Sequence, residues 1–258
     1  MHLSYKPALP LARYVQSLWY SAGHEVAHRR ERVLPGGRFQ IVIDLRDGAS
    51  ATPALVVGMQ SNYAVIDVHG IQSMMGILFR PGGSRSLFDL PSDEFYNRVI
   101  PLELVWGSTV AELRERLQEG ASPAEKFRVL EAALQCRAQN HRELHCAVQH
   151  ALGEFQRVPH VQSVLGISAE AGLSRRRFAQ LFREQVGLTP KLYCRILRFQ
   201  GVISQISSGQ DVDWAEVALA TGYYDQAHLA HEFRGFSGIS LGSYARHKQP
   251  WVNHVPLD

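Results

Sequence analysis

One short pattern occurs twice in this chain, and it limits the possible folds more than any other feature. Residues 172–190 read "GLSRRRFAQLFREQVGLTP", and residues 222–240 read "GYYDQAHLAHEFRGFSGIS". Each copy has a glycine, a short polar stretch, a Phe-Arg pair, and a second glycine five residues after the Phe. A repeated pattern of this kind indicates a repeated structural unit. We therefore expect the same short helix and turn to form twice.

The spacing inside each copy is that of an amphipathic helix with a defined end. Phe178 and Leu229 lie four residues before the Phe of their Phe-Arg pairs, so each pair of apolar residues shares one helix face. Gly187 and Gly238 follow where a helix commonly ends in a left-handed conformation. Both copies thus predict a helix that is buried on one face and ends at a glycine.

A second short helix precedes each copy. Gly172 and Gly222 each follow a short helical pattern, and the residues four positions earlier, Ser168 and Ala218, are small. A small residue lets two helices approach closely, and glycine allows the tight turn between them. This arrangement predicts two helix-turn-helix units.

Residues 190–206, "PKLYCRILRFQGVISQI", predict a linker helix between the units. Pro190 suits the first helical position. The expected apolar face consists of Leu192, Ile196, Phe199, Val202, Ile203 and Ile206. Two units at a fixed separation match successive major grooves, about 34 Å apart. The alternative is a helical repeat with no role in DNA binding.

The first part of the chain predicts β structure and then two helices. Short β-branched and aromatic runs bounded by Gly or Pro occupy residues 38–45, 53–58, 63–70 and 74–83. Helices are expected over 108–120, with Ser108 as N-cap, and over 122–139, with Ser122 as N-cap. The fold class is therefore α+β.

We expect two domains. Residues 1–140 form a β-rich, cupin-like barrel or sandwich with trailing helices, and residues 141–258 form an all-α domain of two helix-turn-helix units. The boundary falls between residues 135 and 150, where we expect a helix to cross it.

Charge and composition favour a DNA-binding protein of the cytoplasm. The net charge is only +3, but seven cations and one anion, Glu184, lie between Ser174 and Arg198. The chain has no apolar run of the roughly 18 residues that a membrane span needs, and no signal peptide. Three cysteines without a CxxC motif suit a reducing compartment.

Residues 160–246 resemble the DNA-binding domain of the AraC family of bacterial transcriptional regulators. The resemblance is carried by "FAQLFREQVGLTPKLY", "EVALATGYYDQAHLAHEFRGFSGIS" and the closing Ser243 and Tyr244. It covers both helix-turn-helix units and the linker helix. Residues 74–107 resemble the β-rich amino-terminal domain of unknown function in one branch of that family.

The resemblance implies which residues contact DNA. Those expected to read bases are Arg176, Ala179, Gln180, Gln226, Ala227, Ala230 and His231. Those expected to contact phosphates are Arg175, Arg183, Lys191, Arg195 and Arg234, each of which also suits a solvated surface. Arg176 suits guanine and the glutamines suit adenine, whereas an alanine offers only contact with a thymine methyl group.

The implied function is sequence-specific DNA binding that regulates transcription. Double-stranded DNA is the expected partner, together with a small-molecule effector at the amino-terminal domain. RNA polymerase and a second copy of the chain are further candidate partners. We expect no cofactor, no bound metal and no enzymatic activity. One alternative is a cupin-like metal enzyme with an appended DNA-binding module, and another is an architectural protein that binds DNA with little sequence preference.

Histidine and cysteine residues suggest two metal sites that we consider less favoured. His141 and His145 are spaced i, i+4 within residues 136–150, which also contain Cys136, Cys146 and His150. We expect a solvated or packing role for this cluster. His24, His28 and His69 lack the HxH pattern and the acidic partner of a cupin metal site.

Overall fold

The computed structural model describes residues 1–23, 28–46, 52–68, 73–138, 142–157, 164–206, 212–246 and 253–257. The β-rich part contains β1 (His2–Tyr5), β2 (Val15–Ala22), β3 (Arg30–Val33), β4 (Gln40–Asp44), β5 (Ala54–Val57), β6 (Ala64–Asp67), β7 (Ser73–Phe79) and β8 (Val99–Pro101). Short 3-10 helices are η1 (Leu11–Arg13), η2 (Gly83–Ser86) and η3 (Ser92–Phe95). The strands expected from the sequence correspond to β4, β5, β6 and β7, so these predictions are confirmed.

The larger sheet has six antiparallel strands in the order β1-β2-β7-β4-β5-β8. In β4, Ile41 and Ile43 are fully buried and alternate with half-buried neighbours, as the period of a strand requires. Gly76 of β7 pairs with Trp19 of β2. A Cβ atom on Gly76 would lie 2.2 Å from the Trp19 ring, so only glycine lets the indole lie flat across the sheet.

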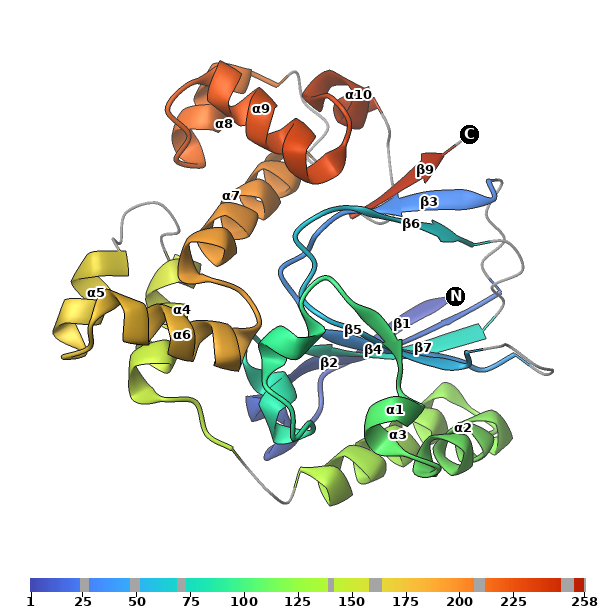
Figure 1. The fold of residues 1–258 in the computed structure, drawn as a ribbon. Coiled ribbons are helices and arrows are strands. Elements are labelled where there is room, and N and C mark those ends of the chain that lie inside the picture. Colours follow the sequence, from blue (N-terminus) through green and yellow to red (C-terminus); the bar gives the residue numbers. More distant parts are fainter. Residues whose placement is uncertain are drawn as a thin grey trace.

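The smaller sheet has three antiparallel strands in the order β6-β3-β9, and it faces the larger sheet (Figure 1). β9 (His254–Leu257) follows the helical region and returns to pair with β3. The two sheets form the predicted cupin-like sandwich, which confirms the α+β fold class. β9 could not be predicted from the sequence, because four residues with one proline carry too little strand pattern.

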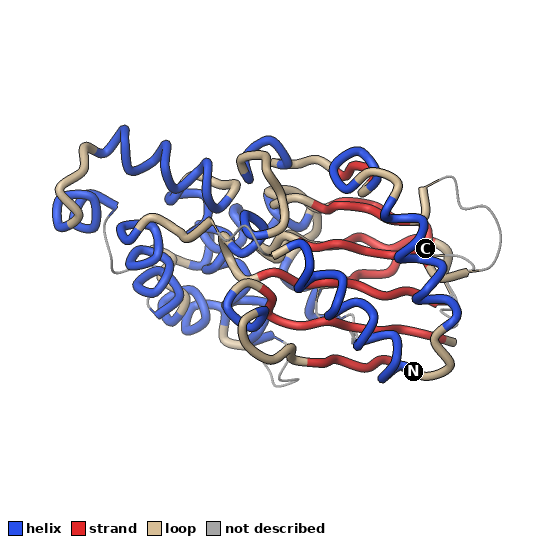
Figure 2. The backbone as a smooth tube through the Cα atoms, turned by 90° about the horizontal axis from the view of Figure 1, so that it is seen from below, coloured by secondary structure: helices blue, strands red, loops and turns tan. Residues whose placement is uncertain are grey.

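Three helices cover the outer face of the six-stranded sheet, and Figure 2 looks from that side. They are α1 (Glu103–Trp106), α2 (Thr109–Glu119) and α3 (Pro123–Arg137). Ser122 caps α3, since its side chain accepts a hydrogen bond from Glu125 N at 3.3 Å, as predicted. Ser108 is the N-cap residue of α2, as expected, but its backbone lies in the α-helical region and its side chain accepts no capping hydrogen bond.

The connection to the helical region differs from the expectation that a helix crosses it. Residues 142–145 are not helical, and α4 (Cys146–Arg157) starts only afterwards. His145 Nδ1 accepts a hydrogen bond from Ala147 N at 3.2 Å, which satisfies a free N–H group at the start of α4. Leu144 packs so closely on Gly82 that a Cβ there would lie 2.7 Å from it. These two contacts accompany the non-helical backbone of residues 142–145.

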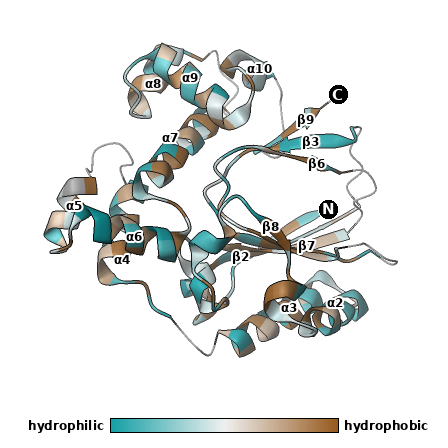
Figure 3. Cartoon of the chain, viewed as in Figure 1, coloured by the Kyte–Doolittle hydropathy of each residue, from teal (hydrophilic) through white to brown (hydrophobic). Residues whose placement is uncertain are grey.

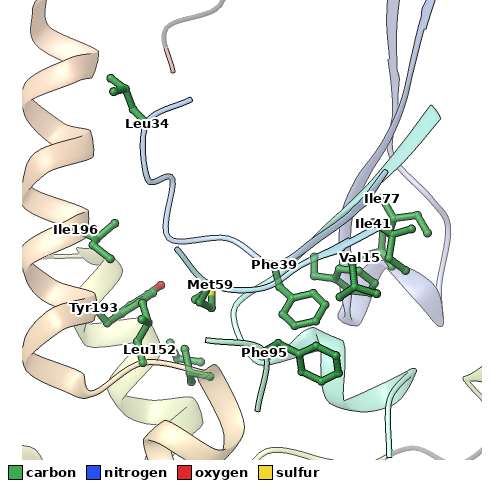
Figure 4. Close-up of a cluster of buried hydrophobic side chains, with 14 of the residues drawn as sticks. Val15, Leu34, Phe39, Ile41, Met59, Ile77, Phe95, Leu152, Tyr193 and Ile196 are labelled. Carbon is green, nitrogen blue, oxygen red and sulfur yellow. The ribbon is translucent and has the colours of Figure 1, made fainter. Parts of the chain in front are cut away.

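The helical region continues with α5 (Val164–Glu170), α6 (Arg175–Val186), α7 (Pro190–Ile206), α8 (Trp214–Ala220), α9 (Gln226–Ser237) and α10 (Leu241–Arg246). Hydrophobic residues recur along α7 among hydrophilic ones (Figure 3), as expected for the linker helix. The buried hydrophobic cluster runs without a break from Phe39 and Ile41 in the β-rich part to Tyr193 and Ile196 on α7 (Figure 4). The two parts of the chain therefore share one continuous core.

Candidate nucleic-acid interface

The first helix-turn-helix unit consists of α5 and α6, with Gly172 at φ +65° in the turn. Ser168 is 3% exposed where the two helices meet, which confirms the predicted small contact residue. Ser174 is the N-cap of α6, and its side chain accepts a hydrogen bond from Arg177 N at 3.3 Å. At the other end, α6 stops at Gly187, whose φ of +94° lies in the left-handed region.

Helix α6 has a buried face and an exposed cationic face. Phe178 and Phe182 are fully buried, as the spacing predicted. Arg176, Gln180 and Arg183 are exposed and spaced four and three residues apart, so they form one stripe along the helix. Ala179 lies beside them and is half-buried, and Arg175 is exposed at the start of the helix.

The second unit consists of α8 and α9, with Gly222 at φ +79° in the turn and Ala218 buried at the helix contact. Asp213 caps α8 by accepting hydrogen bonds from Ala215 N and Glu216 N at 2.9 and 3.2 Å. Asp225 caps α9 by accepting from His228 N at 2.7 Å. The four expected base readers on α9, which are Gln226, Ala227, Ala230 and His231, are all exposed.

Aromatic contacts hold both units on α7. Tyr193 lies 5.7 Å from Phe182 of the first unit, measured between ring centroids. Phe199 lies 5.2 Å from both Phe233 and Phe236 of the second unit. Since all five rings are buried, neither unit can turn on α7 without breaking core contacts. The exposed faces of α6 and α9 are thus held in a fixed relation.

A buried ion-pair network adds to this connection. Glu232 of α9 is 8% exposed, and its carboxylate lies 2.5 Å from Arg195 and 3.5 Å from Arg198 of α7. The Arg195 guanidinium also lies over the Phe236 ring. Sequence reasoning missed Glu232, because a single glutamate on a helix gives no sign of its partners. Arg195 was expected to contact phosphate, but here its guanidinium is held by Glu232.

The expected phosphate contacts fall into two groups. Arg175, Lys191 and Arg234 are exposed and make no ion pair within the described part of the chain. Arg183, by contrast, donates a hydrogen bond to Asp93 of η3 at 2.9 Å. The neighbouring Ser92 is buried and donates from its hydroxyl to the backbone oxygen of Gln185 at 3.1 Å. The β-rich domain therefore rests directly against the end of α6.

Tyr224 is a surface residue that the sequence analysis overlooked. It is 91% exposed and directly precedes Asp225, the N-cap of α9. Its backbone N–H donates to His228 Nδ1 at 3.4 Å, so the turn and the first turn of α9 are linked. Its position directly before the N-cap of an expected recognition helix was the sequence signal that could have identified it.

The histidine and cysteine residues form no metal site among the residues that the structure describes, where no three His, Cys, Asp or Glu side chains gather suitably. Three of the histidines considered, His24, His69 and His141, lie outside the described residues. His28 instead lies 2.7 Å from Glu31, whose other carboxylate oxygen lies 2.7 Å from His254 of β9. Among the helices of the described ranges, none has the length and apolar character to cross a membrane.

Two family models match the chain. Residues 3–101 match a domain of unknown function (DUF6597), and residues 167–247 match a helix-turn-helix domain. The second match spans α6 to α10 with most of α5, so it includes both exposed helices and the linker helix. No curated protein matches the chain.

The solved structures that match the chain are remote in sequence and have TM-scores below 0.5. The carboxy-terminal domain of AraT, a response regulator from Geobacillus stearothermophilus, is 17% identical with a TM-score of 0.37, and the match covers 41% of this chain and 88% of that one. ToxT from Vibrio cholerae is 9% identical with a TM-score of 0.44, over 95% of each chain. ToxT bound to an unsaturated fatty acid is 10% identical with a TM-score of 0.41, over 95% of this chain and 92% of that one.

The helix-turn-helix family match and the two exposed recognition helices agree with the resemblance seen in the sequence. The chain therefore carries a helix-turn-helix domain of AraC type after a β-rich domain of unknown function, and this domain supports a role in DNA binding and the regulation of transcription.

Proposed function

We propose that the protein recognises a specific operator by placing α6 and α9 in successive major grooves on one side of the duplex. The observation that carries this proposal is the packing of both helices on α7, with their polar faces exposed. Helices held by one rigid element reach grooves that are about 34 Å apart only if their separation does not vary. Such a protein works in the cytoplasm, where the DNA of a bacterial cell lies.

The two helices would read DNA by different chemistry. Arg176 of α6 can donate two hydrogen bonds to guanine, and Gln180 can pair with adenine. On α9, Gln226 can pair with adenine, whereas Ala227 and Ala230 offer only methyl contact with thymine. The α9 helix would therefore depend more on the shape of the groove than α6 does.

Phosphate contacts would supply most of the affinity and would come mainly from the first unit. Arg175, Lys191 and Arg234 are exposed cations without a carboxylate partner in the described ranges. Two of them lie on or directly after the first unit, and only Arg234 belongs to the second. Such contacts fix the register of the protein on DNA without reading its sequence.

The β-rich domain would act as the sensor. Its contacts with α6 through Asp93 and Ser92 mean that a change in the domain alters how α6 is presented. An effector with different affinity for two arrangements of the domains would shift the population between them. Dimerisation through this domain would place two such readers on one operator.

The decisive experiment compares Arg176→Ala with Arg116→Ala. Operators are first selected from random DNA at a stated salt concentration, and the affinity of each variant is then measured for every single-base change. If Arg176 reads a guanine, its loss should cost about 1–3 kcal/mol and relax one base position. Arg116 is an exposed arginine of α2 and serves as the matched control, so its variant should bind like wild type. Equal weakening by Arg176→Ala at all sequences would contradict base reading.

A further inference from the structure

A pocket of about 590 Å³ lies between the β-rich domain and the helical region. One wall belongs to the β-rich domain. It consists of residues between β1 and β2, the start of β2, the loop before β4 and the two residues directly after β7. The helical region contributes Gln156 from α4, and Tyr193, Leu197 and Gln200 from α7. A volume of this order is typical of sites for small molecules.

The charge of the pocket is positive and uncompensated. Lys6, Arg38 and Arg80 all line it, and none of the described lining residues is acidic. Lys6 and Arg38 are exposed and make no ion pair within the described ranges. Arg80 is fixed in place, because its Nε donates to Ala12 O at 2.7 Å. Three cations around one hollow attract an anion of more than one charge.

The wall formed by the helical region carries no charged side chain and instead supplies neutral hydrogen-bonding groups. Gln156 Nε2 donates to the Tyr193 hydroxyl at 3.5 Å, and Gln200 Nε2 donates to Pro35 O at 2.8 Å. Burial raises the pKa of Tyr193 to about 12, and the charge of Arg38 acts on it in the opposite direction. Arg38 of the β-rich domain and Tyr193 of α7 thus line the same pocket from opposite parts of the chain.

We propose that this pocket binds a small organic anion with two or more negative charges, such as a phosphate ester or a polycarboxylate. Its charged groups would meet Lys6, Arg38 and Arg80, and its neutral polar groups would meet Tyr193 and the glutamines of the helical wall. Three cations favour such an anion over a monovalent one, because each further charge-assisted hydrogen bond strengthens binding.

A ligand in this position would regulate DNA binding, and this part of the inference rests on the proposed function. The ligand contacts both walls, so it stabilises the arrangement in which the two parts are packed together. In that arrangement Asp93 holds Arg183, one of the three residues of the exposed stripe on α6. Binding of the anion should therefore weaken DNA binding, and DNA should weaken binding of the anion by the same factor.

The first test measures anion binding by the full-length protein. Its melting temperature is recorded with increasing inorganic phosphate, pyrophosphate or citrate, each against sodium chloride of equal ionic strength. We expect a saturable rise with pyrophosphate or citrate beyond that with chloride. The stronger of the two assigns the ligand as a phosphate or a carboxylate compound. The proposal is overturned if no probe exceeds chloride.

Variants show where the anion binds. Arg38→Gln should weaken binding by about tenfold or more, as expected when a charge-assisted hydrogen bond is lost. Lys6→Gln should act in the same direction, and both positions are exposed, so folding is preserved. Arg175→Gln is the matched control on the DNA-facing helix and should leave anion binding unchanged. Loss of binding in Arg175→Gln but not in Arg38→Gln would assign the anion to the DNA face and overturn the proposal.

A second measurement keeps this inference separate from the proposed function. The affinity for a selected operator is measured with and without the probe that binds, in wild type and in Arg38→Gln. If the probe weakens DNA binding by wild type but not by Arg38→Gln, the regulatory role is supported. If the probe leaves DNA binding by wild type unchanged or makes it stronger, that role is overturned. If the protein selects no operator but still binds the anion, the proposed function fails and the pocket assignment stands.

Discussion

Arg183 of α6 donates a hydrogen bond to Asp93 of η3 at 2.9 Å, so a cation on the exposed stripe of α6 is held by the β-rich domain. The pair is partly open to water, since 60% of the arginine side chain and 17% of the aspartate side chain are exposed. Ion pairs of this kind contribute little to stability. Under the proposed function, a DNA phosphate would have to displace Asp93 before it contacts Arg183.

The first prediction is that Asp93→Asn strengthens DNA binding by several-fold. The neutral amide holds Arg183 less tightly, so the guanidinium is free to contact a phosphate. One additional phosphate contact should make the plot of log affinity against log salt steeper by about 0.9. Binding is measured by fluorescence anisotropy at several salt concentrations. Asp89→Asn removes an exposed carboxylate that pairs with Arg142 at 3.5 Å and is the matched control. Weaker DNA binding by Asp93→Asn would contradict the prediction.

The second prediction separates positioning from base reading. Lys191 is exposed at the start of α7 and makes no ion pair in the described residues. Lys191→Ala should weaken binding to all DNA sequences equally. The slope of log affinity against log salt should become shallower by about 1, as expected for the loss of one phosphate contact. The measurement compares the selected operator with random DNA. A change in base preference would show that Lys191 contacts a base edge.

The third prediction concerns the core of the second unit. Phe233 is fully buried, with its ring 5.2 Å from that of Phe199 and 5.5 Å from that of Tyr244. Phe233→Ala should lower the free energy of unfolding by about 3–5 kcal/mol, because it leaves a cavity between these rings. Chemical denaturation provides the measurement. The control is Tyr224→Ala at an exposed site, which should change stability by less than about 0.5 kcal/mol.

The fourth prediction concerns the carboxylate of Glu31 on β3, the strand that pairs with β9. A hydrogen bond from His254 lowers the pKa of Glu31, burial opposes this effect, and a hydrogen bond from His28 adds to the lowering. A carboxyl group with a lowered pKa stabilises the fold above its ordinary pKa of about 4.3, and that stabilisation is lost as the pH falls through the lowered value. The melting temperature of Glu31→Gln should therefore be lower than that of wild type near neutral pH, and this difference should become smaller in acid. A difference that stays constant down to pH of about 3 would show that ionised Glu31 contributes nothing.

The sequence predicted those features that depend on neighbouring residues. The glycine ends of α6 and α9, the apolar spacing of Phe178 and Phe182, and the Ser122 cap are local properties, and the structure confirms them. Ser108 lies at the N-cap position of α2 as expected, but its helical backbone angles leave its side chain without the capping hydrogen bond. The helix expected to cross the boundary between residues 135 and 150 is interrupted at residues 142–145, where Leu144 packs on Gly82 and His145 N donates a hydrogen bond to Gln185 Oε1 at 2.9 Å.

Contacts between distant residues could not be predicted in this way. Glu232 lies 37 positions from Arg195, and Asp93 lies 90 positions from Arg183, so no periodicity links them. The pocket is similar: its cations come from three separate segments of the β-rich domain, and its other wall is formed by residues of α4 and α7. A single sequence records local preference, whereas such pairings depend on the final arrangement of the whole chain.

The pairing of β9 with β3 also has a consequence for how the protein is made. On the ribosome, β3 emerges early and finds β6 soon afterwards, but its other edge has no partner until β9 has been synthesised. An unpaired strand edge invites pairing with another chain. Between those two moments the nascent protein carries such an edge, and pairing with β9 removes it. The smaller sheet can therefore be completed only after the segments of both helix-turn-helix units have been synthesised.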